Sequence, residues 1–143
     1  MIVIDGRELV LGRLASFVAK KLLEGERVTV LNAEHVVISG KVDATLNSYK
    51  AWLATRNVAN PRKGPFHPKR PEDIVRRAIR GMLPYSKPRG IAAFRRLRVY
   101  LGVPEDFSGK EMVQVPRASL AELGTKRFIK VGELSKKLGG SFR

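Results

Sequence analysis

The first 32 residues constrain the fold more than any other stretch of the chain. Met1–Asp5 is an apolar run that ends at the turn signal Asp5-Gly6, and it predicts a buried strand. A helix is predicted from about Leu14 to Glu24, because Gly25 stands where a helix C-terminal cap belongs. Arg27–Asn32 is apolar and β-branched, which is typical of a central strand. A strand, a helix and a strand within about 30 residues form a βαβ unit, which requires parallel pairing and a right-handed crossover.

Beyond this unit the sequence predicts a continued alternation of strands and helices. In chain order they are a strand at Val36–Ile38, a helix from about Asp43 to Arg56, a helix within Pro71–Pro84, a short helix at Ile91–Leu97, a strand at Arg98–Leu101, a strand or extended arm at Glu111–Val115, a short helix at Arg117–Leu123, an extended segment at Phe128–Lys130 and a helix at Val131–Leu138. The 143 residues suffice for one buried core. We therefore expect a single α/β domain over residues 1–143, with residues 103–143 as a C-terminal extension.

The stretch Pro71–Pro84 predicts a strongly amphipathic helix. Pro71 suits the first helical position, and Pro84 prevents continuation. Acidic residues occupy the first turn, as the helix dipole favours. The apolar face is predicted to hold Ile74, Val75, Ala78, Ile79 and Met82, and the opposite side Arg76, Arg77 and Arg80. For this helix taken alone, a solvated charged face and a ligand-binding face are equally compatible with the pattern.

The distribution of charge favours a polyanionic partner. The formal net charge is +15, and residues 49–103 alone hold 14 Lys and Arg against two acids. Self-repulsion at this charge favours nucleic acid as the partner, with an anionic membrane second. No apolar run approaches the roughly 20 residues that span a bilayer, and the N-terminus resembles a strand rather than a signal peptide. The lack of cysteine excludes disulfides and fits a cytoplasmic protein.

Two basic loops flank the amphipathic helix. The segment Asn57–Arg70 has three prolines, and its Phe66 and His67 could stack on bases, while Tyr85–Gly90 is a second basic loop. Arg77 is left out of the predicted contacts because it lies about 100° round the helix from Arg76. The predicted RNA-binding residues are Lys41, Arg56, Arg62, Lys63, His67, Lys69, Arg70, Arg76, Arg80, Lys87, Arg89, Arg95 and Arg96.

The sequence lacks the usual patterns of catalytic and metal sites. His35 and His67 are the only histidines, without cysteine partners or the H-E-x-x-H spacing. Ser39-Gly40-Lys41 is not a P-loop, because the earlier glycine is missing and Val42 replaces the hydroxyl residue. We expect no enzyme activity, no metal and no cofactor. A nucleic-acid-processing enzyme and a DNA-binding basic protein remain as alternatives, although no carboxylate cluster and no helix-turn-helix or zinc-finger pattern is found.

Five short motifs recur along the chain in a characteristic order and spacing. The motifs are Gly12–Ser16, Asn32–Glu34, Ser39–Lys41, Arg80–Pro84 and Leu97–Gly102. Together they resemble the family of the universal thirteenth protein of the large ribosomal subunit, and the match is close from Met1 to Gly102. After Gly102 the sequence resembles the archaeal and eukaryotic branch of that family rather than the bacterial one.

The resemblance implies a fold and a function, both stated here as expectations. It implies three α/β/α layers around a four-stranded, mainly parallel sheet. It also implies a structural protein of the large subunit in the cytoplasm, which binds large-subunit rRNA early in assembly and has ribosomal proteins as neighbours. The expected mechanism is phosphate neutralisation by Arg and Lys on a rigid α/β core.

Overall fold

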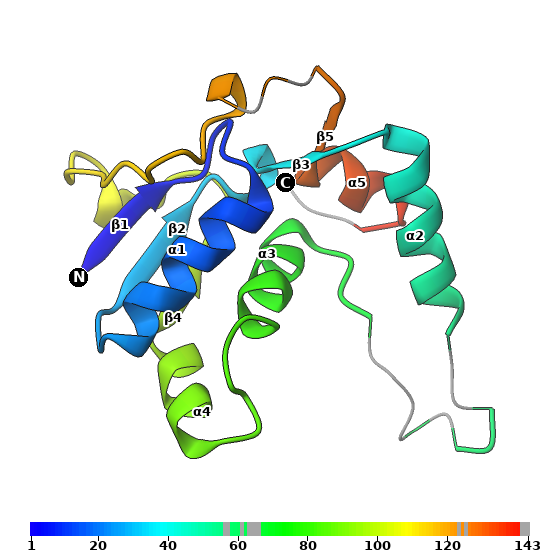
Figure 1. The fold of residues 1–143 in the computed structure, drawn as a ribbon, viewed down its shortest axis with the longest axis horizontal. Helices are drawn as coiled ribbons and strands as arrows, with labels where there is room; N and C mark the ends of the chain where they lie inside the picture. The colour runs from blue at the N-terminus through cyan, green and yellow to red at the C-terminus, as the bar shows by residue number, and fades with distance from the viewer. Residues whose placement is uncertain (56–57, 61, 63–66, 123, 125, 141–143) are drawn as a thin grey trace.

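The computed structural model describes residues 1–55, 58–60, 62, 67–122, 124 and 126–140. Strands and helices alternate along the chain much as the sequence predicts (Figure 1). The elements are β1 (Ile2–Asp5), α1 (Leu11–Leu23), β2 (Val28–Leu31), β3 (Val37–Ser39), α2 (Val42–Ala54), α3 (Pro71–Arg80), α4 (Pro88–Arg95), β4 (Leu97–Val99), β5 (Phe128–Lys130) and α5 (Val131–Lys137), with short 3-10 turns at Ala33–His35, Glu105–Phe107 and Leu120–Glu122.

The predicted βαβ unit is present, with β1 and β2 paired in parallel. Ile2 lies opposite Val28, and Val28 in turn lies opposite Leu97, so that the strand order is β1-β2-β4. All four residues of β2 are buried, which confirms the prediction of a central strand. Gly25 has the positive φ of 96° that a helix-ending glycine adopts, which confirms its predicted place after α1.

The four-stranded sheet implied by the family resemblance is not confirmed. β3 pairs in antiparallel fashion with β5, with Ile38 opposite Ile129, and forms a separate two-stranded sheet. Between β2 and β3 the chain passes through the left-handed residue Asn32, with a φ of 55°, and the turn Ala33–His35. This turn redirects the chain, so that β3 leaves the plane of the parallel sheet.

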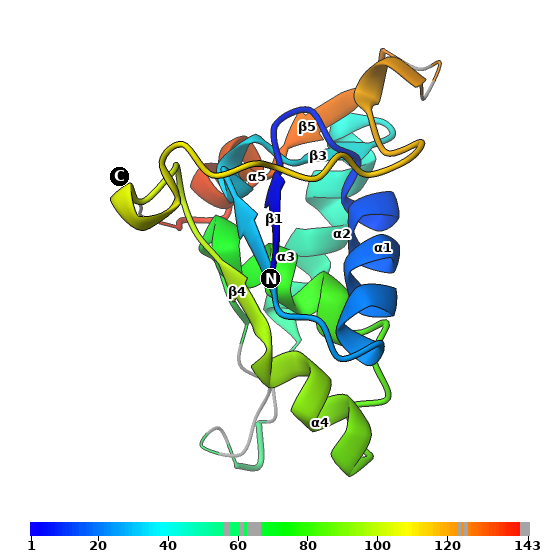
Figure 2. The ribbon, with the colours of Figure 1, turned by 90° about the vertical axis from the view of Figure 1, so that its left-hand side faces the viewer.

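The helices of the parallel sheet lie on one side of it. The order β1-β2-β4 advances in one direction, and right-handed crossovers in one direction place their helices on the same face. Figure 2 shows α1 on one side of the strands, with the segment after β4 passing on the other, and α3 packs with α1 in the main core. The described part of the chain therefore lacks the second helical layer that the resemblance implies for this sheet.

The main core lies between the parallel sheet and these helices. Alternate strand residues point toward α1 and α3, and they meet the apolar stripe of each helix. On the opposite face Val3, Thr29 and Leu31 are also buried. The residues at the centre of the main core are Ile4, Leu14, Val18, Leu22, Val28, Val30, Ile74, Val75, Ile79 and Leu97.

Helix α3 follows its sequence pattern closely. It begins at Pro71 and ends at Arg80, and its predicted core residues Ile74, Val75 and Ile79 are buried. The prediction for Met82 is wrong, since its side chain is 46% exposed. The helix ends before Met82, so helical spacing no longer applies there, and the neighbouring Leu83 is buried instead.

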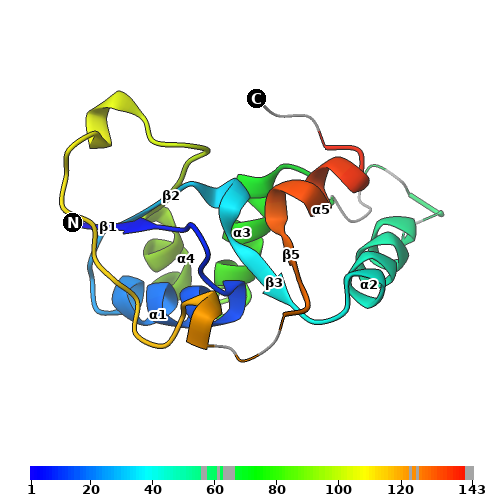
Figure 3. The same ribbon diagram turned by 90° about the horizontal axis from the view of Figure 1, so that it is seen from above.

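The C-terminal extension is mostly irregular before β5. The predicted strand or arm at Glu111–Val115 is an arm, whose Val113 N–H donates to the carbonyl of Val3 at 2.8 Å on the edge strand β1. The predicted helix at Arg117–Leu123 is reduced to the turn Leu120–Glu122 among its described residues. Figure 3 shows this extension running round the sheet before it forms β5 and α5.

Helix α5 holds the start of α3. Ser135 is fully buried, and its Oγ donates to the carbonyl of Lys69, two residues before Pro71. Gly140 packs on the same carbonyl so closely that an added Cβ would lie within 3.0 Å of it. The C-terminal extension therefore fixes the point at which the chain enters α3.

Candidate RNA-binding interface

Three arginines on the solvent side of α3 each lie over an aromatic ring. The Cζ atom of Arg80 lies 4.0 Å from the centre of the Tyr85 ring, and that of Arg76 lies 4.9 Å from the Phe94 ring. The Cζ atom of Arg77 lies 6.0 Å from the Trp52 ring. Contacts of this kind hold guanidinium groups in place and leave N–H donors at their edges. We call Arg76, Arg77 and Arg80 the arginine face.

The rings come from three different parts of the chain. Trp52 lies on α2, Tyr85 in the turn after α3, and Phe94 on α4. The Tyr85 and Phe94 rings also meet edge to face, with centres 5.6 Å apart. The aromatic contacts of the arginine face thus come from α2, from α4 and from the turn after α3 rather than from α3 alone.

The arginine face surrounds a shallow hollow of about 350 Å³. Its wall combines cationic and aromatic groups with a single carboxylate, that of Asp73 in the first turn of α3. Such a surface suits phosphate oxygens and unpaired bases of RNA. The lining residues are His67, Pro68, Asp73, Arg76, Arg77, Arg80 and Phe94.

The predicted contact residue His67 connects α2 with the segment before α3. Its Nε2 lies 2.8 Å from the carbonyl oxygen of Thr55, just after α2, and its ring meets Trp52 with centres 4.3 Å apart. A carbonyl only accepts, so Nε2 carries the proton in this contact. His67 therefore lines the hollow and also links the segment before α3 to the end of α2.

Two other predicted residues have structural partners. Arg96 donates from Nη2 to the carbonyl of Leu22 at 2.7 Å, at the end of α1. Arg70 pairs with Glu72, with Nε and Oε1 2.9 Å apart. Arg96 thus stabilises the C-terminal end of α1, whereas Arg70 forms an ion pair with an acidic residue in the first turn of α3.

The remaining predicted residues fall into three groups. Lys69, Lys87, Arg89 and Arg95 are exposed near α3 or on α4, and Arg62 is an exposed residue of the long loop. Lys41 lies at the other end of α2 from Trp52, beside Lys126 and Arg127, roughly 16 Å away along the helix axis. Arg56 and Lys63 lie outside the described residues.

Sequence reasoning missed Arg77 and the three aromatic partners. Arg77 was excluded by its angle on α3, but α2 stands on that side and supplies Trp52. An aromatic residue within a helical pattern is usually a core residue, and the sequence does not show that Trp52, Tyr85 and Phe94 lie under arginines.

Comparison with known proteins decides the family. The profile of the family Ribosomal protein L13 matches residues 1–106. The chain belongs to this family. The large ribosomal subunit protein uL13 of Methanocaldococcus jannaschii is 47% identical over 143 residues, which cover 99% of this chain and 100% of that protein. The uL13 protein of Methanosarcina barkeri is 46% identical with the same coverage, and that of Methanosphaera stadtmanae is 45% identical over 98% of each chain.

These relatives confirm the resemblance that the sequence motifs predicted. They are archaeal proteins and match this chain through its C-terminal extension, beyond the last residue of the family profile. The stretch that these relatives match therefore includes β5 and α5, and Ser135 of α5 contacts the entry to α3.

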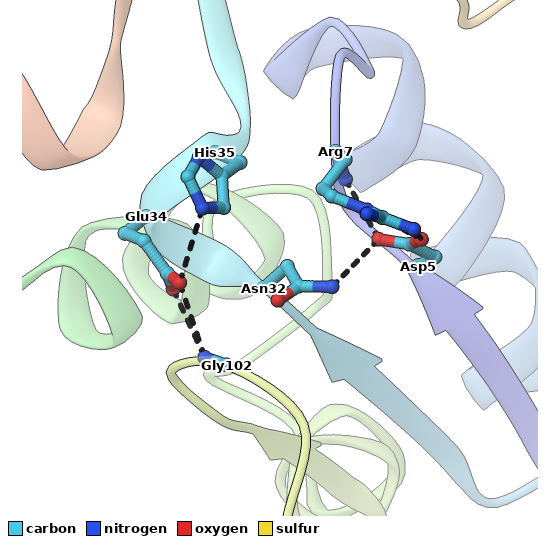
Figure 4. A network of polar contacts seen from close by, with 6 residues as sticks. All are labelled: Asp5, Arg7, Asn32, Glu34, His35 and Gly102. Carbon is cyan, nitrogen blue, oxygen red and sulfur yellow. Dashed lines mark hydrogen bonds and ion pairs between the residues drawn. The ribbon is translucent and has the colours of Figure 1, made fainter. Parts of the chain in front are cut away.

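A polar network lies at the carboxyl ends of β1 and β2 (Figure 4). Asp5 accepts hydrogen bonds from Asn32 Nδ2 at 2.9 Å and from the Arg7 backbone N–H and Nε at 3.0 and 2.9 Å. Glu34 accepts from the Gly102 N–H with both carboxylate oxygens, at 3.1 and 3.2 Å. His35 Nε2 lies 3.5 Å from Glu34 Oε1. The network joins the ends of all three parallel strands.

The carboxylates of this network act as structural acceptors. Each of them already faces backbone or side-chain donors, and a metal ion would have to displace these partners. Across the described parts of the chain, three or more His, Cys, Asp or Glu side chains are nowhere grouped so as to hold a metal ion. Within those same parts, every helix is too short or too polar to cross a membrane.

The network predicts a specific loss of stability in acid. Burial acts to raise the pKa of Asp5, but hydrogen bonds from Arg7 and Asn32 outweigh it and hold that pKa below its usual value. A carboxyl whose pKa is lowered by folding stabilises the protein above its unfolded pKa of about 3.9, and this contribution is lost as pH falls through the folded pKa. Asp5→Asn should therefore destabilise the protein at neutral pH, and its difference from wild type should shrink as the pH falls below the unfolded pKa of about 3.9.

Urea unfolding of both proteins at a series of pH values measures this difference. Glu26→Gln, which changes an exposed carboxylate outside the network, is the control. A wild-type advantage that did not change at all as the pH fell below about 3.9 would show that the charge of Asp5 contributes nothing to the network.

Proposed function

We propose that this chain is a structural component of the large ribosomal subunit and binds large-subunit rRNA through the arginine face. The observation that carries the proposal is that a chain of this ribosomal protein family also has a surface suited to RNA. The relatives are named large ribosomal subunit proteins, and α3 presents three guanidinium groups held over rings beside a hollow.

The mechanism is neutralisation of RNA phosphates by a preorganised surface. The core residues of α3 fix the helix against the sheet, and the aromatic contacts limit the motion of the arginines. Fewer side-chain rotamers then have to be fixed when RNA binds. Lys87, Arg89 and Arg95 add charge near the same helix, and the remaining basic residues named from the sequence would extend the contact.

Binding of rRNA also accounts for the net charge of +15. Phosphates relieve the self-repulsion of such a chain. We place this binding early in subunit assembly and in the cytoplasm, with other large-subunit proteins as neighbours. The role is structural rather than enzymatic, as in the family, and no observation favours the nuclease or the DNA-binding alternative.

The proposal predicts a steep dependence of rRNA binding on salt. With about six to ten phosphate contacts, log affinity plotted against log salt should fall with a slope of about 5 or more in magnitude. Filter binding of the whole chain to large-subunit rRNA, with small-subunit rRNA as competitor, measures the slope and the preference. A flat salt dependence would rule out phosphate neutralisation as the mechanism.

A further inference from the structure

A second hollow lies between α2 and α3 and differs in character from the arginine face. Its volume is about 310 Å³, and its lining is mainly apolar. Tyr49 and Trp52 contribute from α2, and Ile74 and Ala78 from α3. Pro68 and Arg77 line both this hollow and the one at the arginine face. The two hollows are therefore adjacent, with Arg77 between them.

Helix α2 is only partly covered by the rest of the described chain. None of the residues Val42–Ala54 is fully buried, although Tyr49 and Leu53 pack against core residues. Tyr49 is half-buried, and burial raises the pKa of its phenol. Figure 1 shows α2 standing beside α3 at the edge of the molecule. The hollow thus has an apolar, aromatic wall on the α2 side and the start of the core on the other.

The aromatic wall has room for a flat ring system. Trp52 meets Tyr49 and His67 only edge to face, at interplanar angles of 89° and 75°. Among the described rings, none stacks face to face on the indole. A hollow of this size lies at the low end of the range for small-molecule pockets, and it suits one ring system rather than a larger ligand.

We propose that this hollow receives a single unstacked base of the RNA whose phosphates bind the arginine face. The inference rests on the proposed function and adds a second mode of contact to it. An unpaired base brings a flat apolar surface with a phosphate on either side. The hollow and the adjacent arginines match that arrangement in shape and charge. Bases splayed from single strands, loops and bulges commonly stack on aromatic and guanidinium groups in this way.

The sole tryptophan of the chain provides the measurement. Trp52 lines the hollow, so its fluorescence, excited selectively, reports directly on an occupying base. The probes are a hexamer of riboadenylate and a hexamer of the same length that keeps ribose and phosphate but lacks the bases. We expect the complete hexamer to bind the whole chain roughly tenfold more tightly and to quench Trp52, because stacking depends on the base alone.

The salt dependence separates the two modes of contact. Both hexamers offer the same phosphates, so their affinities should fall together as salt rises. The ratio of the two affinities should stay constant, because stacking in an apolar hollow carries little charge. A ratio that collapsed with salt would mean that the difference comes from phosphate contacts, and would overturn the proposal.

A matched pair of variants tests the place of binding. Ala78→Leu fills the hollow from α3, whereas Ala92→Leu adds the same atoms at an exposed position on α4. Ala78→Leu should bind both hexamers with equal affinity and lose the quenching, while Ala92→Leu should behave as wild type. If Ala78→Leu does not fold, Ser48→Leu replaces it in this test, because it fills the hollow from its exposed edge.

The outcomes distinguish this inference from the proposed function. Equal binding of both hexamers by wild type, together with salt-sensitive binding of large-subunit rRNA, would overturn the base site and leave the proposed function standing. The hollow would then be free for a protein neighbour. Failure to bind the rRNA at all would overturn both.

Discussion

Replacing Gly90 by alanine is expected to destabilise the protein by about 3 kcal/mol or more. Gly90 lies in the first turn of α4 and is buried against the end of the preceding turn. A Cβ there would lie within 3.0 Å of the carbonyl oxygen and carbon of Pro84 and of the Tyr85 nitrogen. These atoms belong to the backbone, so α4 itself would have to move. The change would also separate Tyr85 and Phe94 from the arginines above them.

The sign of this effect opposes ordinary helix propensity. Alanine in a helix is usually more stable than glycine by about 1 kcal/mol. Gly12→Ala in α1 is the matched control, because a Cβ there has no atom within 4 Å and the residue is exposed. Urea unfolding should show Gly12→Ala neutral or stabilised and Gly90→Ala strongly destabilised. If both variants gained stability alike, the close approach of α4 to Pro84 would be wrong.

Ile79→Ala should destabilise the protein by about 2–5 kcal/mol, because it empties space in the main core. Ile79 is fully buried on the face of α3 that meets the sheet and α1. Arg76→Ala and Arg80→Ala, on the other face, should each lose no more than about 1 kcal/mol, the value of a cation–π contact at an accessible site. The proposal thus predicts that one face of α3 contributes mainly to stability and the other mainly to RNA binding.

Urea unfolding of these three variants measures the separation. Met82→Ala is the control for an apolar residue close to α3, since Met82 is 46% exposed and should change the unfolding free energy by at most about 0.5 kcal/mol. Should the arginine variants lose as much stability as Ile79→Ala, the arginine face would be part of the fold rather than a binding surface.

Local signals in the sequence predict most of the elements. Pro71 and the acidic first turn locate the start of α3, and Gly25 locates the end of α1. Boundaries shift where two signals compete. We predicted α4 from Ile91, but it begins at Pro88, whose fixed φ suits the first turn of a helix.

Pairing between distant segments could not be predicted from local pattern. The run Val36–Ile38 indicates a strand, but its partner β5 lies some 90 residues further on. The family resemblance counted this strand in a single sheet. The turn at Asn32, which takes it out of that sheet, depends on a left-handed backbone that the residue type permits but does not require.

In the candidate interface, too, the local sequence pattern predicts some residues and not others. Arg76 and Arg80 follow from helical periodicity, and the structure places them together. Arg96 looks equally basic in the sequence, but its partner is the carbonyl of Leu22, 74 residues away. Only the packed structure separates cations that stabilise helix ends from those that line a hollow.

The most direct test of the account is the salt slope of rRNA binding for two double variants of equal net charge. Arg76→Ala with Arg80→Ala removes two members of the arginine face. Lys20→Ala with Arg27→Ala removes two exposed cations, one from α1 and one from the residue before β2. The account predicts that the first pair lowers the magnitude of the slope by about two, one unit for each phosphate contact, and that the second pair leaves it unchanged. Equal slopes for both pairs would show that only total charge matters, and would contradict a binding role for the arginine face.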